Sequence, residues 1–130
     1  MMGGRGGMLP EGGFVKQRYH VVDYVNGVKV LEPKDSRERL SLTERSGTPD
    51  TSYVCYRKDG TFRQFITFDE NRMPIYEIDY GIHKKILSLH VHKYKDGERS
   101  SEIEYLGPGH DLYEKHKKLF KGVKIWKGLI

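Results

Sequence analysis

The sequence predicts an α+β fold, an antiparallel β-sheet meander of about five to seven strands with one C-terminal helix. Apolar and polar residues alternate at period two over most of the stretch from 15 to 106, which is typical of half-buried strands. Turn signals such as Asn26-Gly27 and Asp96-Gly97 separate the alternating segments. Beyond residue 106 the apolar residues recur at the spacing of one helical face. Strands followed by a helix indicate an α+β domain.

The length and composition favour one small globular domain. Residues 1–13 contain six glycines and no periodic apolar pattern, so we expect a flexible leader followed by a single α+β domain over 14–130. Cys55 is the only cysteine, which excludes an internal disulfide and a cysteine-rich zinc cluster. No apolar run approaches the roughly 20 residues of a membrane span, and no secretory signal is visible. We expect no membrane association.

The first strands form a predicted hairpin. Alternating residues over 15–30 surround Asn26-Gly27, which suits a type I′ turn. Asp35 and Glu38 have the spacing of a capping box, which predicts a short helix to about residue 44.

One continuous antiparallel meander is predicted over 52–106. Lys58-Asp59-Gly60, the stretch 69–72 and Asp96-Gly97 mark its turns. Gly81 allows a bend between the strand that starts near residue 75 and the strand at 86–94.

The C-terminal helix is predicted over 111–121. Asp111 and Glu114 have the spacing of a capping box, and Gly122 suits the C-terminal cap. The apolar face of this helix comprises Leu112, His116, Leu119 and Phe120. Residues 123–130 predict a last strand or an extended arm that carries Trp126.

Basic residues gather in the C-terminal segment. The chain has 23 basic and 18 acidic residues, and residues 111–130 contain six lysines against two carboxylates. Such a segment suits polyanions, nucleic acid first, although a solvated helix face has the same composition. The lysines that we expect to contact phosphates are Lys84, Lys85, Lys115, Lys117 and Lys118.

The strand at 86–94 carries the residues that best suit catalysis. Its apolar face comprises Leu87, Leu89 and Val91, and its polar face comprises Ser88, His90, His92 and Tyr94. His90 and His92 therefore point the same way, roughly 6.5–7 Å apart. One imidazole can deprotonate a ribose 2′-hydroxyl while the other protonates the leaving oxygen. Asp79 or Glu77 on the neighbouring strand can orient a ring.

Two other interpretations of this histidine pair stay open. His90 and His92 can bind zinc or another transition metal together with His83 or His110 and Asp79. They can also be solvent-facing side chains beside Tyr94 without a chemical role. We expect no metal and no cofactor in the leading interpretation.

Part of the chain resembles a known family. The run from Phe68 to Tyr80, followed by His90-x-His92-x-Tyr94, resembles predicted ribonuclease domains of bacterial polymorphic toxins, of the barnase–colicin–RelE-like class. This resemblance implies a small antiparallel sheet with helical cover and a metal-independent endoribonuclease whose site residues are Asp79, His90 and His92. Residues 2–7 resemble the start of small proteins from the head-gene region of tailed phages.

Together these features predict a small phage- or prophage-type protein that interacts with nucleic acid, RNA in preference to DNA. It carries a ribonuclease-toxin-like domain and acts in the host cytoplasm or the phage particle. The alternative is a non-enzymatic phage accessory protein that binds a phage structural or host protein. A histidine-based metal-binding module is the third interpretation.

Overall fold

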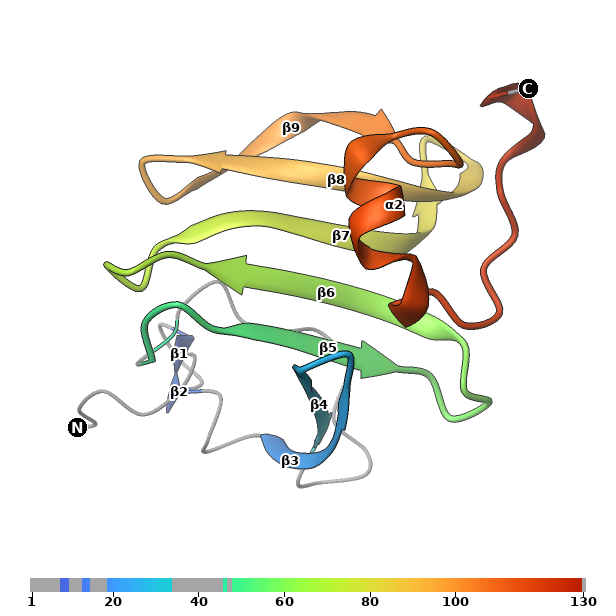
Figure 1. Ribbon diagram of the computed structural model, residues 1–130. Helices are drawn as coiled ribbons and strands as arrows, with labels where there is room; N and C mark the ends of the chain where they lie inside the picture. Colours follow the sequence, from blue (N-terminus) through green and yellow to red (C-terminus); the bar gives the residue numbers. More distant parts are fainter. Residues whose placement is uncertain (1–7, 10–12, 15–18, 34–45, 47, 130) are drawn as a thin grey trace.

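The computed structural model describes residues 8–9, 13–14, 19–33, 46 and 48–129. Its main feature is a seven-stranded sheet whose spatial order follows the sequence (Figure 1). The strands are β3 (Tyr19–Val25), β4 (Val28–Pro33), β5 (Ser52–Tyr56), β6 (Phe62–Phe68), β7 (Pro74–His83), β8 (Ile86–Lys95) and β9 (Glu98–Tyr105). All neighbours pair antiparallel except β4 and β5, which run parallel. The predicted α+β meander with one C-terminal helix is confirmed.

The short strands β1 (Met8–Leu9) and β2 (Gly13–Phe14) form a separate two-stranded sheet. They lie within and just after the segment predicted as a leader. The short helix predicted over 35–44 lies outside the described residues. No helix in the described part of the chain has the length and apolar character that crossing a bilayer requires.

The turns decide the register of the sheet. Asn26 and Gly27 both have positive φ, 53° and 81°, as a type I′ turn requires. The connection to β8 does not begin at Gly81 as predicted, because β7 stays paired with β8 through Gly81 as far as His83. Lys84 and Lys85 make the two-residue turn instead, with φ of 50° and 69°. Sequence reasoning missed this turn because lysine is a rare choice for left-handed backbone.

The C-terminal helix is shorter than predicted and begins differently. It comprises α2 (Asp111–His116) followed by a 3₁₀ turn, η1 (Lys117–Leu119), so the helix does not reach residue 121. The N-cap is His110 and not Asp111, since the His110 Nδ1 accepts from the Leu112 N–H at 3.1 Å. The Glu114 carboxylate still reaches back, but to the Gly109 N–H.

One face of the sheet, the helix face, is covered by α2 and η1 (Figure 1). A single apolar cluster fills the space between them and includes Phe65, Ile78, Leu89, Val91 and Leu119. After η1 the chain continues to a second 3₁₀ turn, η2 (Lys127–Leu129), and its described residues form no strand, so of the two predicted alternatives the last strand is excluded. The Trp126 ring instead packs on Tyr105, with centroids 4.5 Å apart.

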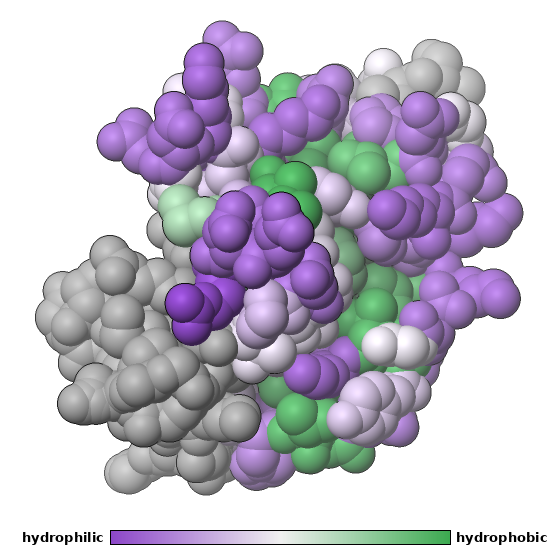
Figure 2. All heavy atoms as spheres, turned by 60° about the vertical axis from the view of Figure 1, so that its left-hand side comes forward, coloured by the Kyte–Doolittle hydropathy of each residue, from purple (hydrophilic) through white to green (hydrophobic). Residues whose placement is uncertain are grey.

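The opposite face, here called the histidine face, has two parts. Over β3–β6 it buries a second apolar cluster that comprises Tyr19, Leu31, Tyr53, Cys55, Ile66 and Phe68. Over β6–β9 it buries polar side chains instead, and these form the candidate site. The view from the left-hand side of Figure 1 shows hydrophilic side chains over much of the surface, with smaller hydrophobic areas between them (Figure 2).

Candidate metal centre

Strands β7 and β8 provide the framework of the site. Glu77 lies opposite His92 and Asp79 lies opposite His90 in the antiparallel ladder. Because side chains alternate along a strand, these four point away from Ile78, Leu89 and Val91, which are buried under α2. The predicted division of the 86–94 strand is therefore confirmed for Leu89 and Val91 on the apolar face and for His90 and His92 on the polar face. Leu87, predicted on the apolar face, is instead exposed near the β7–β8 turn.

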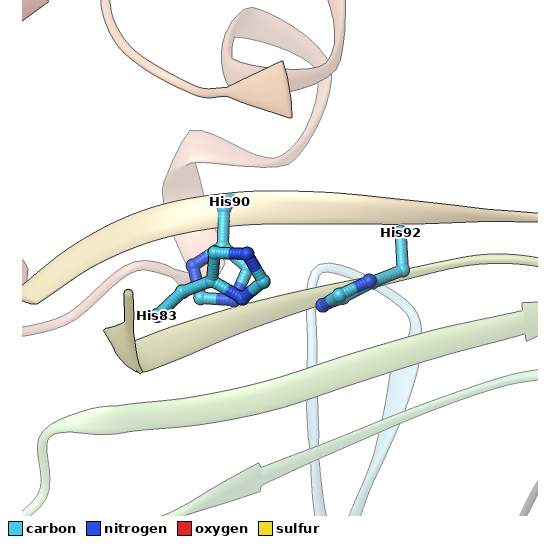
Figure 3. Close-up of side chains that lie close together, drawn as sticks. All are labelled: His83, His90 and His92. Atoms are coloured by element: carbon cyan, nitrogen blue, oxygen red, sulfur yellow. The ribbon is translucent and has the colours of Figure 1, made fainter. Parts of the chain in front are cut away.

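Three imidazoles meet on the histidine face. One ring nitrogen from each of His83, His90 and His92 lies within 4.8 Å of the others. The ring centroids are 5.3 Å apart for His83 and His90, 5.8 Å for His83 and His92, and 5.3 Å for His90 and His92. Figure 3 shows the rings of His83 and His90 against each other, with His92 turned toward them. The pairing of β7 with β8 up to His83, and the two-residue turn after it, bring His83 into this group.

Backbone carbonyls set the tautomers of two of the rings. The His90 Nδ1 lies 3.0 Å from the Ser88 carbonyl oxygen, and the His92 Nδ1 lies 3.2 Å from the Ser100 carbonyl oxygen. A carbonyl oxygen can only accept, so each Nδ1 carries the proton in the neutral ring. The Nε2 of each ring then keeps its lone pair.

Burial keeps these imidazoles neutral. Burial lowers the pKa of His90 to about 4, and it also lowers the pKa of His92. The two residues are only 3% and 5% exposed. The Nε2 of His83 is buried and makes no hydrogen bond to another described residue. The Nε2 atoms of His90 and His92 therefore carry free lone pairs.

Asp79 adjoins the histidines. Its Oδ2 lies 3.8 Å from the His92 Nε2 and 3.2 Å from Nη2 of Arg99. Burial, together with the nearby Glu77 carboxylate, raises the pKa of Asp79 to about 8. Its Oδ1 is buried without a hydrogen-bond partner among the described residues.

Glu77 is the paired member of the two carboxylates. It accepts hydrogen bonds from the Tyr94 hydroxyl and from the Gln64 side-chain amide, the latter at 3.0 Å. The Arg99 Nε lies 3.4 Å from its Oε1. Although burial raises the pKa of Glu77, its hydrogen bonds with Asp79 and Tyr94 and the Arg99 charge outweigh that effect, so the pKa is lowered. Glu77 is thus the charged carboxylate of the pair.

The cluster opens into a pocket of about 1010 Å³. The three histidines and Asp79 line it together with Arg57, Arg63 and Arg99, as do Ile82 and Leu87 near the β7–β8 turn. Concave sites of this size are typical places for small ligands.

The predicted site residues divide into two groups. His90, His92 and Asp79 lie together, and His83 from the metal interpretation joins them. His110 does not, because it caps α2. Lys84 and Lys85 are exposed in the β7–β8 turn. The exposed lysines of the C-terminal segment, Lys115, Lys117 and Lys118, belong to α2 and η1, across the sheet from the histidines.

Sequence reasoning did not assign the arginines to this site. The position of Arg99 beside the polar face of β8 could have been predicted, because the two-residue turn at Asp96-Gly97 sets Arg99 opposite Tyr94. Arg63 carries no such signal. It is the extra residue where the β5–β6 register shifts between Cys55 and Tyr56, and no local pattern marks that bulge.

No protein family, curated protein or solved structure matches this chain. The resemblance to ribonuclease toxin domains stays a prediction.

Proposed function

We propose that this protein is a metal-binding module whose centre is formed by His83, His90 and His92. The observation that carries the proposal is the convergence of three ring nitrogens within 4.8 Å on a buried face of the sheet. Three imidazoles that face one another without a shared ligand gain no stabilising contact for their ring nitrogens. A transition metal would give all three nitrogens a common partner.

The distances and the protonation state both suit a metal. Nitrogens bound to one zinc ion at 2.0–2.1 Å lie roughly 3.3 Å apart in a tetrahedral site. Small ring rotations would therefore close the present cluster around an ion. Metal ligands must be deprotonated, and the lowered pKa values of His90 and His92 meet this condition at neutral pH.

The surroundings favour zinc or a similar ion. Nδ1–H groups that donate to backbone carbonyls, as those of His90 and His92 do, orient imidazole ligands and raise their basicity. Imidazole ligands select zinc, copper, iron or nickel over magnesium and calcium. Three protein ligands leave a fourth position open to water or a ligand, which is typical of catalytic zinc sites.

Calorimetric titration of the metal-free protein with Zn²⁺ tests the proposal. We expect one ion per chain, and we expect each of His83→Gln, His90→Gln and His92→Gln to weaken binding by at least about tenfold. Two histidines provide matched controls. His116 is buried on the helix face and His20 is exposed on β3, so His116→Gln and His20→Gln should bind zinc like the wild type. Wild type that binds no Zn²⁺, or site variants that bind it equally well, would refute the proposal.

A second candidate is the endoribonuclease suggested by the resemblance, in a phage-type protein that interacts with nucleic acid. The observation that favours it is that His90, His92 and Asp79 line one pocket large enough for a nucleotide. Cleavage of RNA in the presence of a metal chelator, lost in both His90→Gln and His92→Gln, would support it. RNA that stays intact at high protein concentration would exclude it.

A further inference from the structure

The charge of the pocket points to the ligand that would accompany a metal. Three imidazole ligands bring no negative charge, so they would not compensate the two positive charges of a bound ion in a half-enclosed site. The two carboxylates near the histidines, Glu77 and Asp79, both already face Arg99, at 3.4 and 3.2 Å. The loaded site would therefore attract an anion.

Two arginines add to this positive charge. Arg57 donates from Nη1 to the Phe62 carbonyl and from Nη2 to the Tyr80 carbonyl, both at 2.8 Å. These bonds fix its guanidinium without neutralising it. Arg63 is half-buried in the pocket lining, and no hydrogen bond or ion pair links its guanidinium to another described residue. Arg63 is thus available to a ligand.

We propose that the pocket binds a phosphate ester, with one phosphate oxygen completing the metal coordination and the Arg63 guanidinium donating to the other oxygens. This inference rests on the proposed metal centre. A dianionic phosphate balances the two charges of the ion, which a carboxylate does not. The planar guanidinium fork also matches two phosphate oxygens.

The pocket is larger than a phosphate group requires. Its volume of about 1010 Å³ leaves space for the organic part of an ester. Ile82 and Leu87 line the same pocket and are 75% and 51% exposed, so they provide an apolar surface for that part. An ester with an aromatic or apolar group fits this combination better than inorganic phosphate.

Calorimetry of the zinc-loaded protein with phenyl phosphate tests the inference. We expect binding that weakens at least about tenfold without zinc and at least about tenfold in Arg63→Gln, while Arg63→Gln keeps the wild-type zinc affinity. Lys118→Gln, on the helix face, is the matched charge control and should change neither affinity. If Arg63→Gln does not fold, Arg63→Lys replaces it as the test variant. This substitution keeps the positive charge but loses the planar guanidinium, so we expect it to bind phenyl phosphate several-fold more weakly than the wild type.

The possible outcomes separate the two proposals. If zinc does not bind, both the metal centre and this inference are overturned. If zinc binds but phenyl phosphate does not, or if the Arg63 variants bind it as wild type does, only the phosphate site is overturned. Equal affinity for benzoate would overturn the preference for phosphate.

Discussion

On the helix face the buried His116 has a partner for its Nε2, whereas on the histidine face the rings of His83, His90 and His92 converge. The His116 Nε2 lies 2.7 Å from the Tyr76 hydroxyl, and its ring packs on Phe65 at 4.4 Å. Burial lowers the pKa of both His116 and His90 to about 4. A lowered pKa therefore does not distinguish a structural histidine from a ligand. What distinguishes them is the partner of the ring nitrogen.

The two faces also differ in their buried carboxylates. Glu77 and Asp79 are both buried on the histidine face, and the apolar cluster of the helix face contains no carboxylate. Within the described residues, the buried side-chain atoms without a hydrogen bond are the Asp79 Oδ1 and the His83 Nε2, and both belong to the histidine face. A buried polar atom without a partner destabilises the fold, and such atoms are informative in a native structure. Here they indicate a site prepared for a ligand.

The largest effect on stability should come from the helix face. Phe65 is 1% exposed and packs against Tyr76 and His116. Phe65→Ala should lower the free energy of unfolding by about 3–5 kcal/mol, because it removes apolar contacts and leaves a cavity. Urea denaturation measures this change. The exposed Val22→Ala provides the control, with an expected change within about 0.5 kcal/mol. Equal effects of the two substitutions would contradict the assignment of the core.

On the histidine face, Glu77→Gln should have the next largest effect. The substitution removes the negative charge that pairs with Arg99 and replaces a charged acceptor of the Tyr94 hydroxyl by a neutral one, so we expect a loss of about 2–4 kcal/mol in stability. It should also lower the pKa of Asp79 below about 8, since the Glu77 carboxylate contributes to that raised value. Carboxyl NMR titration of Asp79 in both proteins measures the shift. An unchanged pKa would mean that burial alone raises it.

His116 should make stability sensitive to acid. Its pKa of about 4 lies below the ordinary 6.5, so the unfolded chain binds more protons between these values. Its contribution is complete above pH 6.5 and is lost as the pH falls toward 4, on the order of 1–3 kcal/mol. His116→Gln, which keeps a partner for the Tyr76 hydroxyl, should show a weaker loss in chemical denaturation from pH 7 to 4.

Other buried groups also titrate over this pH range, so only the difference between the two proteins is diagnostic. His90 and His92 change stability in the same direction as His116, and Asp79, with its raised pKa, changes it in the opposite direction. All three are common to wild type and variant. Parallel pH curves would show that His116 is not held neutral by the fold.

The smallest expected effect concerns the turn that places His83. Lys84 and Lys85 both have positive φ, where Asn and Gly are favoured. Lys84→Asn combined with Lys85→Gly should raise the free energy of unfolding by about 0.5–1 kcal/mol. The register of β7 and β8 would stay the same, so zinc affinity should be retained. Thermal unfolding with and without Zn²⁺ measures both quantities. Lost zinc binding would show that the lysines themselves support the site.

The sheet could be predicted because most of its turns carry typical residues. Asn26-Gly27 and Asp96-Gly97 mark hairpins whose register then follows from alternation. The alternation also gave the apolar and polar faces of β8. The parallel pairing of β4 with β5 could not be predicted, because it depends on a long connection rather than on a local turn.

The site was predicted less completely than the sheet. His90, His92 and Asp79 followed from strand alternation, whereas the choice between His83 and His110 as a third histidine stayed open. Lys84-Lys85 is not a typical turn sequence, so the sequence did not indicate where β7 ends. The position of Arg63 depends on a bulge, and the burial of the rings depends on the whole sheet. Tertiary contacts, not local patterns, assemble the three-histidine cluster.

X-ray absorption spectroscopy at the zinc edge shows directly whether the three histidines bind one ion. In the protein loaded with one Zn²⁺ per chain, we expect three imidazole nitrogens at about 2.0–2.1 Å from the zinc and one further oxygen or nitrogen atom. His83→Gln should reduce the imidazole number to two, because the described structure offers no other histidine near the cluster. The same spectrum in wild type and in His83→Gln, His90→Gln and His92→Gln would contradict the account, since the ion would then be bound elsewhere.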